Sequence, residues 1–382
     1  MREYAYIGCR TTKERNARGK GIRVYEIIDG TWTLRQILEG PVNPSYLCLN
    51  EAQDRLYTVH GDFEQVSAFQ IHENGELSYL NTVKTHGTNP VHLSLDKTGK
   101  WMFVANLQTG GISVIPVKED GSLDQIHDLM FLSGNGGPGY VSHPHQVTQD
   151  RTGKWLLVPS QGRLQGVGKI TVFSIDSENG ILKEAFVKKA RSGAEPRHCV
   201  FHPNNRFCYC VNEKDSTAAF YLFDEETGTL EPQQILTSLP ENYTGDGWAS
   251  AIEMGKDGRF LYLSNRKHDS VTVYSINQET GYMTYLQNLP TKGQQPRFIT
   301  RSQDGTRLFA ANELTDSICC MKIDSQTGLL SYEEEEIFAE SPFGNSPKGG
   351  LTYSTGFPVI FSIRRFVSSS SLSASSSLIF VS

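Results

Sequence analysis

NPVHLSLDKTGKWMFVAN, residues 89–106, contains the pattern from which the fold can be predicted. A short run of alternating polar and apolar residues leads into the polar turn Asp96-Lys-Thr-Gly99, and a second apolar run begins at Trp101. Asp and Gly are typical of tight turns because they accept positive φ angles or form side-chain-stabilised bends. The stretch therefore predicts two antiparallel strands joined by a tight turn.

The same pattern occurs five more times along the chain. The copies are 43–61 NPSYLCLNEAQDRLYTVHG, 143–160 HPHQVTQDRTGKWLLVPS, 195–213 EPRHCVFHPNNRFCYCVNE, 248–266 WASAIEMGKDGRFLYLSNR and 295–313 QPRFITRSQDGTRLFAANE. Each copy is followed by a third strand, a turn and a fourth strand, as in VSAFQIHENGELSYL at 66–80. The lead positions 44, 90, 144, 196, 249 and 296 are 46 to 54 residues apart. Four strands in a repeat of about 40–50 residues indicate the blades of a β-propeller.

The start of the chain carries a partial repeat. Residues 4–9 (YAYIGC), 22–27 (IRVYEI) and 31–38 (TWTLRQIL) match the second, third and fourth strands of a blade. We therefore predict an all-β fold, a seven-bladed β-propeller of four-stranded antiparallel blades, whose missing strand comes from the C-terminal end. Residues 1–342 would form the propeller, and 343–382 an atypical Ser-rich tail with two candidate closing strands. PVIFSI at 358–363 is favoured over SLIFVS at 377–382 because it has a lead proline, but the sequence does not secure closure.

Composition excludes several classes of function. The 382 residues carry 36 Lys and Arg against 42 Asp and Glu, a net charge of -6, which disfavours non-specific binding to nucleic acid or anionic membranes. No apolar run is long enough to span a membrane, and the N-terminus lacks the apolar region of a secretory signal. The seven Cys residues are scattered through strand-like runs, so we expect reduced thiols in a cytoplasmic protein. We expect neither a cofactor nor a metal, and a monomer or weak homodimer.

Ring symmetry predicts where chemistry can occur. The first strand of each blade lines the central channel, so equivalent positions of different blades converge on one axis. The positions after the lead residue and at the end of the second strand carry ionisable side chains where core strands would carry apolar ones. These are His92, His145, Arg197, His198, Glu213, Arg266, Arg297 and Glu313.

Each candidate also has a purely structural interpretation. His92 alone is more typical of a turn residue than of a ligand, and Arg197 and Glu213 could form an ion pair within one blade. Arg163 and Lys169 lie in the Gly-rich stretch QGRLQGVGK at 161–169, where we expect solvation. That stretch lacks the strand–loop–helix context of a nucleotide site.

The segments at 143–149 (HPHQVTQ), 195–213 and 295–298 (QPRF) resemble the seven-bladed propeller lactonase family. That family includes propeller-type 6-phosphogluconolactonases and, more distantly, a carboxymuconate-lactonising enzyme. The resemblance covers about residues 4–340 and implies a metal-independent site in which His145, Arg197 and Glu213 are catalytic. His198, Arg266, Arg297 and His92 are expected to bind the substrate.

The resemblance implies hydrolysis of a small anionic sugar-acid lactone, 6-phosphogluconolactone foremost. Either His145 or Glu213 could activate water, while Arg197 could hold the developing oxyanion. Arg266, Lys267 and Arg297 are available for a phosphate. Two alternatives remain at this point: a lactonising cycloisomerase or other lactonase that uses the same residues, and a non-catalytic scaffold for a protein partner.

Overall fold

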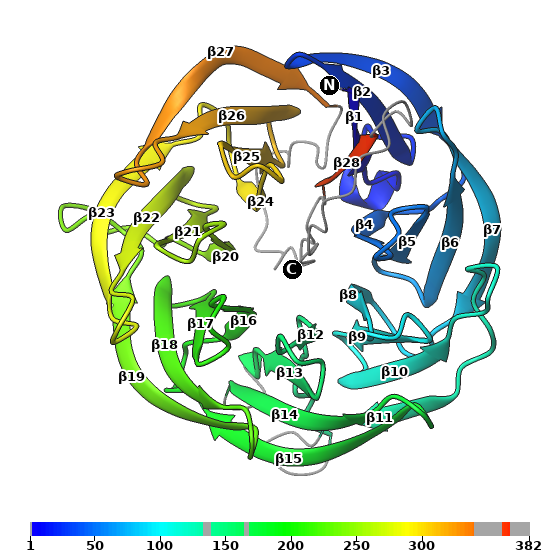
Figure 1. Ribbon diagram of the computed structural model, residues 1–382, viewed down its shortest axis with the longest axis horizontal. Helices are drawn as coiled ribbons and strands as arrows, with labels where there is room; N and C mark the ends of the chain where they lie inside the picture. Colours follow the sequence, from blue (N-terminus) through cyan, green and yellow to red (C-terminus); the bar gives the residue numbers. More distant parts are fainter. Residues whose placement is uncertain (1, 133–138, 164–167, 340–360, 367–382) are drawn as a thin grey trace, which may run out of the picture.

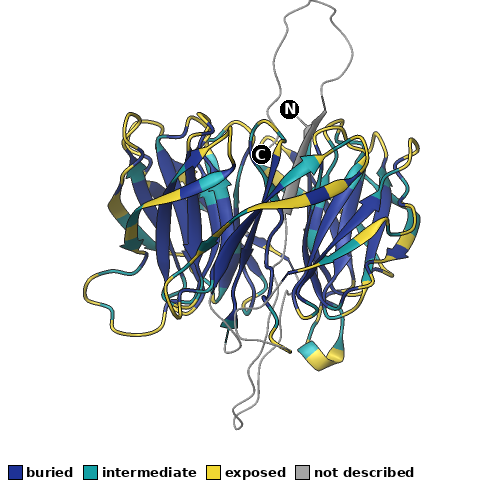
Figure 2. Cartoon of the chain, turned by 90° about the horizontal axis from the view of Figure 1, so that it is seen from below, coloured by how far each residue is buried: buried dark blue, intermediate teal, exposed yellow. Residues whose placement is uncertain are grey.

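The computed structural model describes residues 2–132, 139–163, 168–339 and 361–366. Seven sheets, each with four antiparallel strands, stand around a central channel, and the first strand of each sheet lies nearest that channel (Figure 1). Seen from the side, the inner strands are largely buried, whereas the outermost strands and the connecting turns are partly exposed (Figure 2). The predicted seven-bladed β-propeller is therefore confirmed.

The strands are assigned to blades in chain order. Blade 1 contains β28 (Phe361–Phe366), β1 (Arg2–Gly8), β2 (Ile22–Ile28) and β3 (Thr31–Leu38), with the short helix η1 (Lys13–Arg15) between β1 and β2. Blade 2 contains β4 (Pro44–Leu49), β5 (Arg55–His60), β6 (Gln65–Ile71) and β7 (Leu77–Lys84). Blade 3 contains β8 (Pro90–Leu95), β9 (Trp101–Asn106), β10 (Gly111–Pro116) and β11 (Asp128–Phe131).

The remaining blades follow the same order. Blade 4 contains β12 (Thr148–Gln149), β13 (Trp155–Ser160), β14 (Lys169–Asp176) and β15 (Ile181–Lys189). Blade 5 contains β16 (Pro196–Phe201), β17 (Phe207–Asn212), β18 (Thr217–Asp224) and β19 (Thr229–Thr237). Blade 6 contains β20 (Ala249–Met254), β21 (Phe260–Asn265), β22 (Ser270–Ile276) and β23 (Met283–Pro290), and blade 7 contains β24 (Pro296–Arg301), β25 (Arg307–Asn312), β26 (Ser317–Ile323) and β27 (Leu330–Phe338).

The ring is closed by a strand from the C-terminal end. β28 pairs antiparallel with β1, with Arg2 opposite Phe366 and Ile7 opposite Phe361. It overlaps the favoured candidate at 358–363, although residues 358–360 and the second candidate at 377–382 lie outside the described residues. Because the two chain ends share one sheet, β1 is hydrogen-bonded on both sides and does not present an open edge.

Each inner strand begins with the same backbone irregularity. The residue before the lead position has a left-handed backbone in blades 2 to 7, with φ between 43° and 62°; these residues are Asn43, Asn89, His143, Glu195, Trp248 and Gln295. The strand register then shifts directly after the lead residue in five blades, at Pro44, Pro90, Pro196, Ala249 and Pro296. Such a bulge leaves one residue unpaired and turns its side chain away from the regular alternation.

Adjacent blades pack through the turn between the third and fourth strands. In blade 2 this turn contains Gly75, whose carbonyl accepts a hydrogen bond from the Tyr6 hydroxyl of blade 1 at 2.9 Å. A Cβ atom at Gly75 would lie 2.2 Å from the Tyr4 ring. The same arrangement recurs between blades 5 and 6, where Tyr209 donates to the Gly281 carbonyl at 2.7 Å. Gly75 and Gly281 are therefore needed to seat aromatic side chains of the preceding blade, since a Cβ there would meet the rings of Tyr4 and Phe220.

Replacing Gly75 by Ala should lower thermal stability more than replacing Gly99 by Ala. Both glycines have left-handed backbones, with φ of 81° and 71°, so both variants carry the strain of that conformation, about 1–2 kcal/mol. Only Gly75 faces an aromatic ring, since nothing lies within 4 Å of a Cβ at Gly99. Overpacking typically adds about 1–3 kcal/mol. Equal shifts in Tm for the two variants would contradict this account of blade packing.

Candidate functional site

The ends of the second strands meet at one mouth of the channel. In blades 2 to 7 the N–H after the second strand donates to the carbonyl of the left-handed residue, at 2.9–3.1 Å; the donors are Gly61, Leu107, Gln161, Glu213, Arg266 and Glu313. This bond holds the end of the second strand beside the bulge of the first. The side chain after the second strand and the side chain at the bulge of the first strand are therefore neighbours within each blade.

Arg197 occupies the bulge of β16 and is fully buried. Its Nη1 donates to the Ser250 carbonyl of blade 6 at 2.8 Å, and its Nε lies 3.0 Å from Oε2 of Glu213. Its Nη2 is buried and has no hydrogen-bond partner among the described residues. Arg197 therefore links two blades and keeps one nitrogen available for a ligand.

Glu213 is the hub of the ion pairs at this mouth. Besides Arg197, its carboxylate lies 2.8 Å from Nη2 of Arg266 in blade 6 and accepts a 2.8 Å hydrogen bond from Nε2 of Gln161 in blade 4. Burial by itself would raise the pKa of Glu213, but the charges of Arg266, Arg197 and Arg297 lower it to about 2. The group is thus a carboxylate at any physiological pH.

Two imidazoles extend the cluster toward blade 4. Nη1 of Arg197 lies 3.3 Å from Nε2 of His198, which in turn lies 3.2 Å from Nδ1 of His145. Burial first, and then the charge of Arg197, hold the pKa of both histidines well below its usual value. Both rings are therefore neutral at pH 7 and can accept a proton.

His92 lies among the channel rings rather than in the ion-pair network. Its ring packs on Tyr46 at 3.8 Å between centroids and meets His198 edge-on at 5.6 Å. Its Nδ1 accepts a 3.4 Å hydrogen bond from the Val147 backbone. Burial, together with Arg197, keeps its pKa well below the usual value. The structure thus brings His92 beside the imidazole cluster.

Arg297 has its own buried partner in blade 7. Its Nη1 lies 3.4 Å from Oε2 of Glu313, and both side chains are 1% exposed. Burial lowers the pKa of Arg297 to about 10 although the charge of Glu313 opposes the shift, and Arg266 and Glu213 also act on it. Arg297 is therefore electrostatically part of the cluster around Glu213.

Two residues of this cluster, Gln161 and Glu195, were not singled out by the sequence. The expectation that Lys169 is solvated is wrong, because its side chain is buried; Arg163 is half-buried, and its Nε donates to Oε1 of Gln161 at 3.0 Å. Burial and the charge of Glu213 raise the pKa of Glu195 to about 7. Gln161 occupies the module position of Glu213, and Glu195 precedes a lead proline. Glu195 and Gln161 would both have been found if the residue before each lead position and the residue after each second strand had been included among the candidates.

Among the described residues, no group of three or more His, Cys, Asp or Glu side chains is arranged to hold a metal ion. In the described part of the chain, none of the helices combines the length and the apolar character that crossing a membrane requires.

The comparisons with known proteins agree with the fold. Residues 4–344 match the model of the family described as "Lactonase, 7-bladed beta-propeller". The 6-phosphogluconolactonase of Bacillus subtilis is 31% identical over 67% of this chain and 73% of its own length. That of Pectobacterium atrosepticum is 31% identical over 72% of this chain and 80% of its own.

A solved structure shows the same architecture. The periplasmic gluconolactonase PpgL of Pseudomonas aeruginosa superposes with a TM-score of 0.81 at 23% identity, over 94% of this chain and 99% of that one. At that identity the likeness establishes the fold alone. The family match over nearly the whole propeller and the two curated relatives establish more: this chain is a member of the seven-bladed β-propeller lactonase family.

Proposed function

We propose that this lactonase hydrolyses a sugar-acid lactone, with 6-phosphogluconolactone as its substrate. The observation that carries the proposal is the charge balance at the channel mouth. Arg163, Arg197, Arg266 and Arg297 surround two ion-paired carboxylates, Glu213 and Glu313, in a chain whose net charge is -6. A local excess of positive charge in an acidic protein suits an anionic substrate. The names of the curated relatives support the phosphorylated lactone.

The reaction needs a base and an oxyanion ligand. In the mechanism we propose, His145 takes a proton from water while the water oxygen bonds to the lactone carbonyl carbon. The carbonyl oxygen becomes an oxyanion and accepts a hydrogen bond from the buried Nη2 of Arg197. The bond from that carbon to the ring oxygen then breaks, and the ring oxygen takes the proton from His145. The product is an open-chain hydroxy acid.

We favour His145 over Glu213 as the base, an alternative that the sequence left open. Glu213 has a pKa of about 2 and is held by two arginines, so it binds a proton poorly. His145 is neutral and lies next to His198, with which it can share a proton through a hydrogen bond. Glu213 then acts as a positioning residue that fixes the guanidinium groups of Arg197 and Arg266.

All seven cysteines are free thiols in the structure. Burial raises the pKa of Cys48 to about 11, which keeps that thiol protonated and unreactive. This pattern supports a reducing compartment, and we propose the cytoplasm as the place of action and a small anionic lactone as the only partner the site requires.

Substitution of His145 by Asn should lower kcat for freshly prepared 6-phosphogluconolactone by about 100- to 10,000-fold, the usual contribution of a general base. Arg197→Ala should lower kcat/KM by a comparable factor because the oxyanion loses its donor. The assay is proton release, with the spontaneous rate subtracted. His202→Asn is the matched control, since His202 is also buried but caps a turn through its bond to the Asn204 backbone. An unaltered rate in both site variants would exclude this mechanism, and a wild-type protein without activity would exclude the substrate.

The KM for the anionic lactone should rise as pH increases through about 7. Below this pH Glu195 is protonated and neutral, whereas above it the carboxylate adds a negative charge beside Glu213 and repels the substrate. Glu195→Gln should remove this part of the pH dependence and keep the low-pH KM. Parallel pH profiles for the wild type and the variant would show that Glu195 does not act on the substrate.

A further inference from the structure

We propose that the loop between β1 and β2, residues 9–21, forms with Asp62 and Asn89 a second anion subsite, which binds the phosphate of the substrate. This inference rests on the proposed function, because it assigns one end of the phosphorylated lactone to a wall of the channel mouth formed by blades 1 to 3. The reacting carbonyl stays at Arg197, in blade 5.

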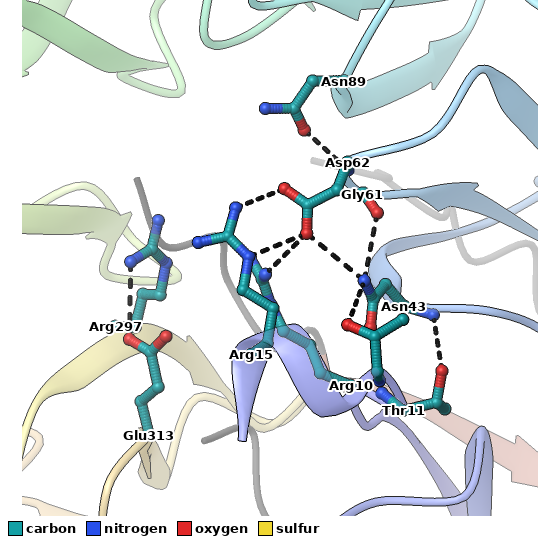
Figure 3. A network of polar contacts seen from close by, with 10 residues as sticks. Arg10, Thr11, Arg15, Asn43, Gly61, Asp62, Asn89, Arg297 and Glu313 are labelled. Atoms are coloured by element: carbon teal, nitrogen blue, oxygen red, sulfur yellow. Dashed lines mark hydrogen bonds and ion pairs between the residues drawn. The ribbon is translucent and has the colours of Figure 1, made fainter. Parts of the chain in front are cut away.

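Asp62 holds two arginines of the loop in place (Figure 3). Nε of Arg15 donates to Oδ2 of Asp62 at 2.9 Å, and Nη2 of Arg15 contacts Oδ1. Nη1 of Arg10 donates to Oδ2 at 3.3 Å. Asn43 joins the loop to blade 2, since its Oδ1 accepts a 2.9 Å hydrogen bond from the Thr11 backbone. The loop is therefore fixed against blade 2 before any ligand arrives.

Asn89 supplies a buried donor at the same place. Its Oδ1 accepts a 2.9 Å hydrogen bond from the Asp62 backbone N–H, which fixes the orientation of the amide. Its Nδ2 is buried and has no partner among the described residues, and the side chain is 0% exposed. Figure 3 shows this nitrogen pointing away from Asp62. In this view it points to the side on which the guanidinium groups of Arg15 and Arg297 lie. A buried donor without a protein partner commonly marks the position of a ligand or bound ion.

The charges at this wall suit a dianion. Arg10 and Arg15 share one carboxylate, Asp62, so the wall has an excess of positive charge, while the neighbouring Arg297–Glu313 pair of blade 7 is neutral as a whole. Arg15 is 18% exposed and can reach a ligand, whereas Arg10 is 1% exposed and acts from below as a fixed charge. A phosphate monoester carries about -1.5 to -2 charges at pH 7 and three acceptor oxygens, which a guanidinium fork and an amide can satisfy together.

Arg297 connects the two subsites. It acts electrostatically on Arg10 on one side and on Glu213 and Arg266 on the other. A ligand with a reacting carbonyl at one end and a phosphate at the other can therefore be held at both ends while Arg297 lies between them. With this arrangement the enzyme would distinguish phosphorylated from unphosphorylated lactones through the binding step, seen in KM, and not through the chemical step, seen in kcat.

The test compares two substrates, 6-phosphogluconolactone and glucono-δ-lactone, in the wild type and in Arg15→Gln. The variant should raise KM for the phosphorylated lactone by about 10- to 100-fold, the effect of one charge-assisted hydrogen bond, and leave its kcat and both constants for the unphosphorylated lactone nearly unchanged. Arg18→Gln is the matched control: it removes the same charge from the same loop, but Arg18 is 47% exposed and pairs with Asp316 of blade 7.

An equal change for both lactones, or none, would overturn the inference. A selective loss in Lys267→Gln instead of Arg15→Gln would also overturn it and place the phosphate at the rim of blade 6, where Lys267 lies over the Trp248 ring. Calorimetric titration with 6-phosphogluconate and with gluconate measures the subsite without turnover. If the wild type hydrolyses neither lactone, the proposed function fails, and a preference for 6-phosphogluconate that Arg15→Gln abolishes would still support the subsite.

Discussion

The bulge at the start of the inner strand, which five blades share, is the constraint on which the site depends. A left-handed residue and a register shift recur at the same position around the ring, at Glu195 and Pro196 for example. In a regular strand, Arg197 and His198 would point to opposite faces of the sheet. The bulge sets both opposite Val211, and Arg197 then contacts His198 as well as the next blade. A repeated backbone irregularity thus converts a fold with a packed interior into one that can present charged groups at its axis.

Burying several guanidinium groups at one axis is expensive unless each has a partner. The protein distributes three carboxylates for this purpose: Glu213 between Arg197 and Arg266, Glu313 on Arg297, and Asp62 on Arg10 and Arg15. The carboxylates come from the ends of second strands or directly after them, the arginines largely from bulges and loops. Since these three carboxylates are fewer than the arginines they hold, the mouth has an excess of positive charge that suits an anionic ligand. Specificity for anions is therefore a consequence of how the site is stabilised.

The fold was predictable because its determinants are local and repeated. Turn residues and strand alternation at 89–106 define one blade, and recurrence defines the ring. The convergence of Arg197, His198, Glu213, Arg266 and Arg297 followed from symmetry as well. Contacts between unlike positions could not be predicted in this way. Arg10 and Arg15 come from the loop 9–21 of blade 1, which is longer than the corresponding loop 61–64 of blade 2, and Gln161 reaches Glu213 from a neighbouring blade. The closing strand was located to within a few residues, because a lead proline at 358 resembles the other blades while the strand itself begins at Phe361.

The low basicity of His145 has a consequence for the proposed mechanism. Burial and the charges of Arg197, His198 and Arg297 keep the imidazole neutral, but they also make it a weak base. An anionic lactone bound between the arginines compensates their charge and removes part of the electrostatic penalty on the imidazolium. The pKa of His145 should therefore rise when substrate binds, so that base strength is greatest when a lactone is in place.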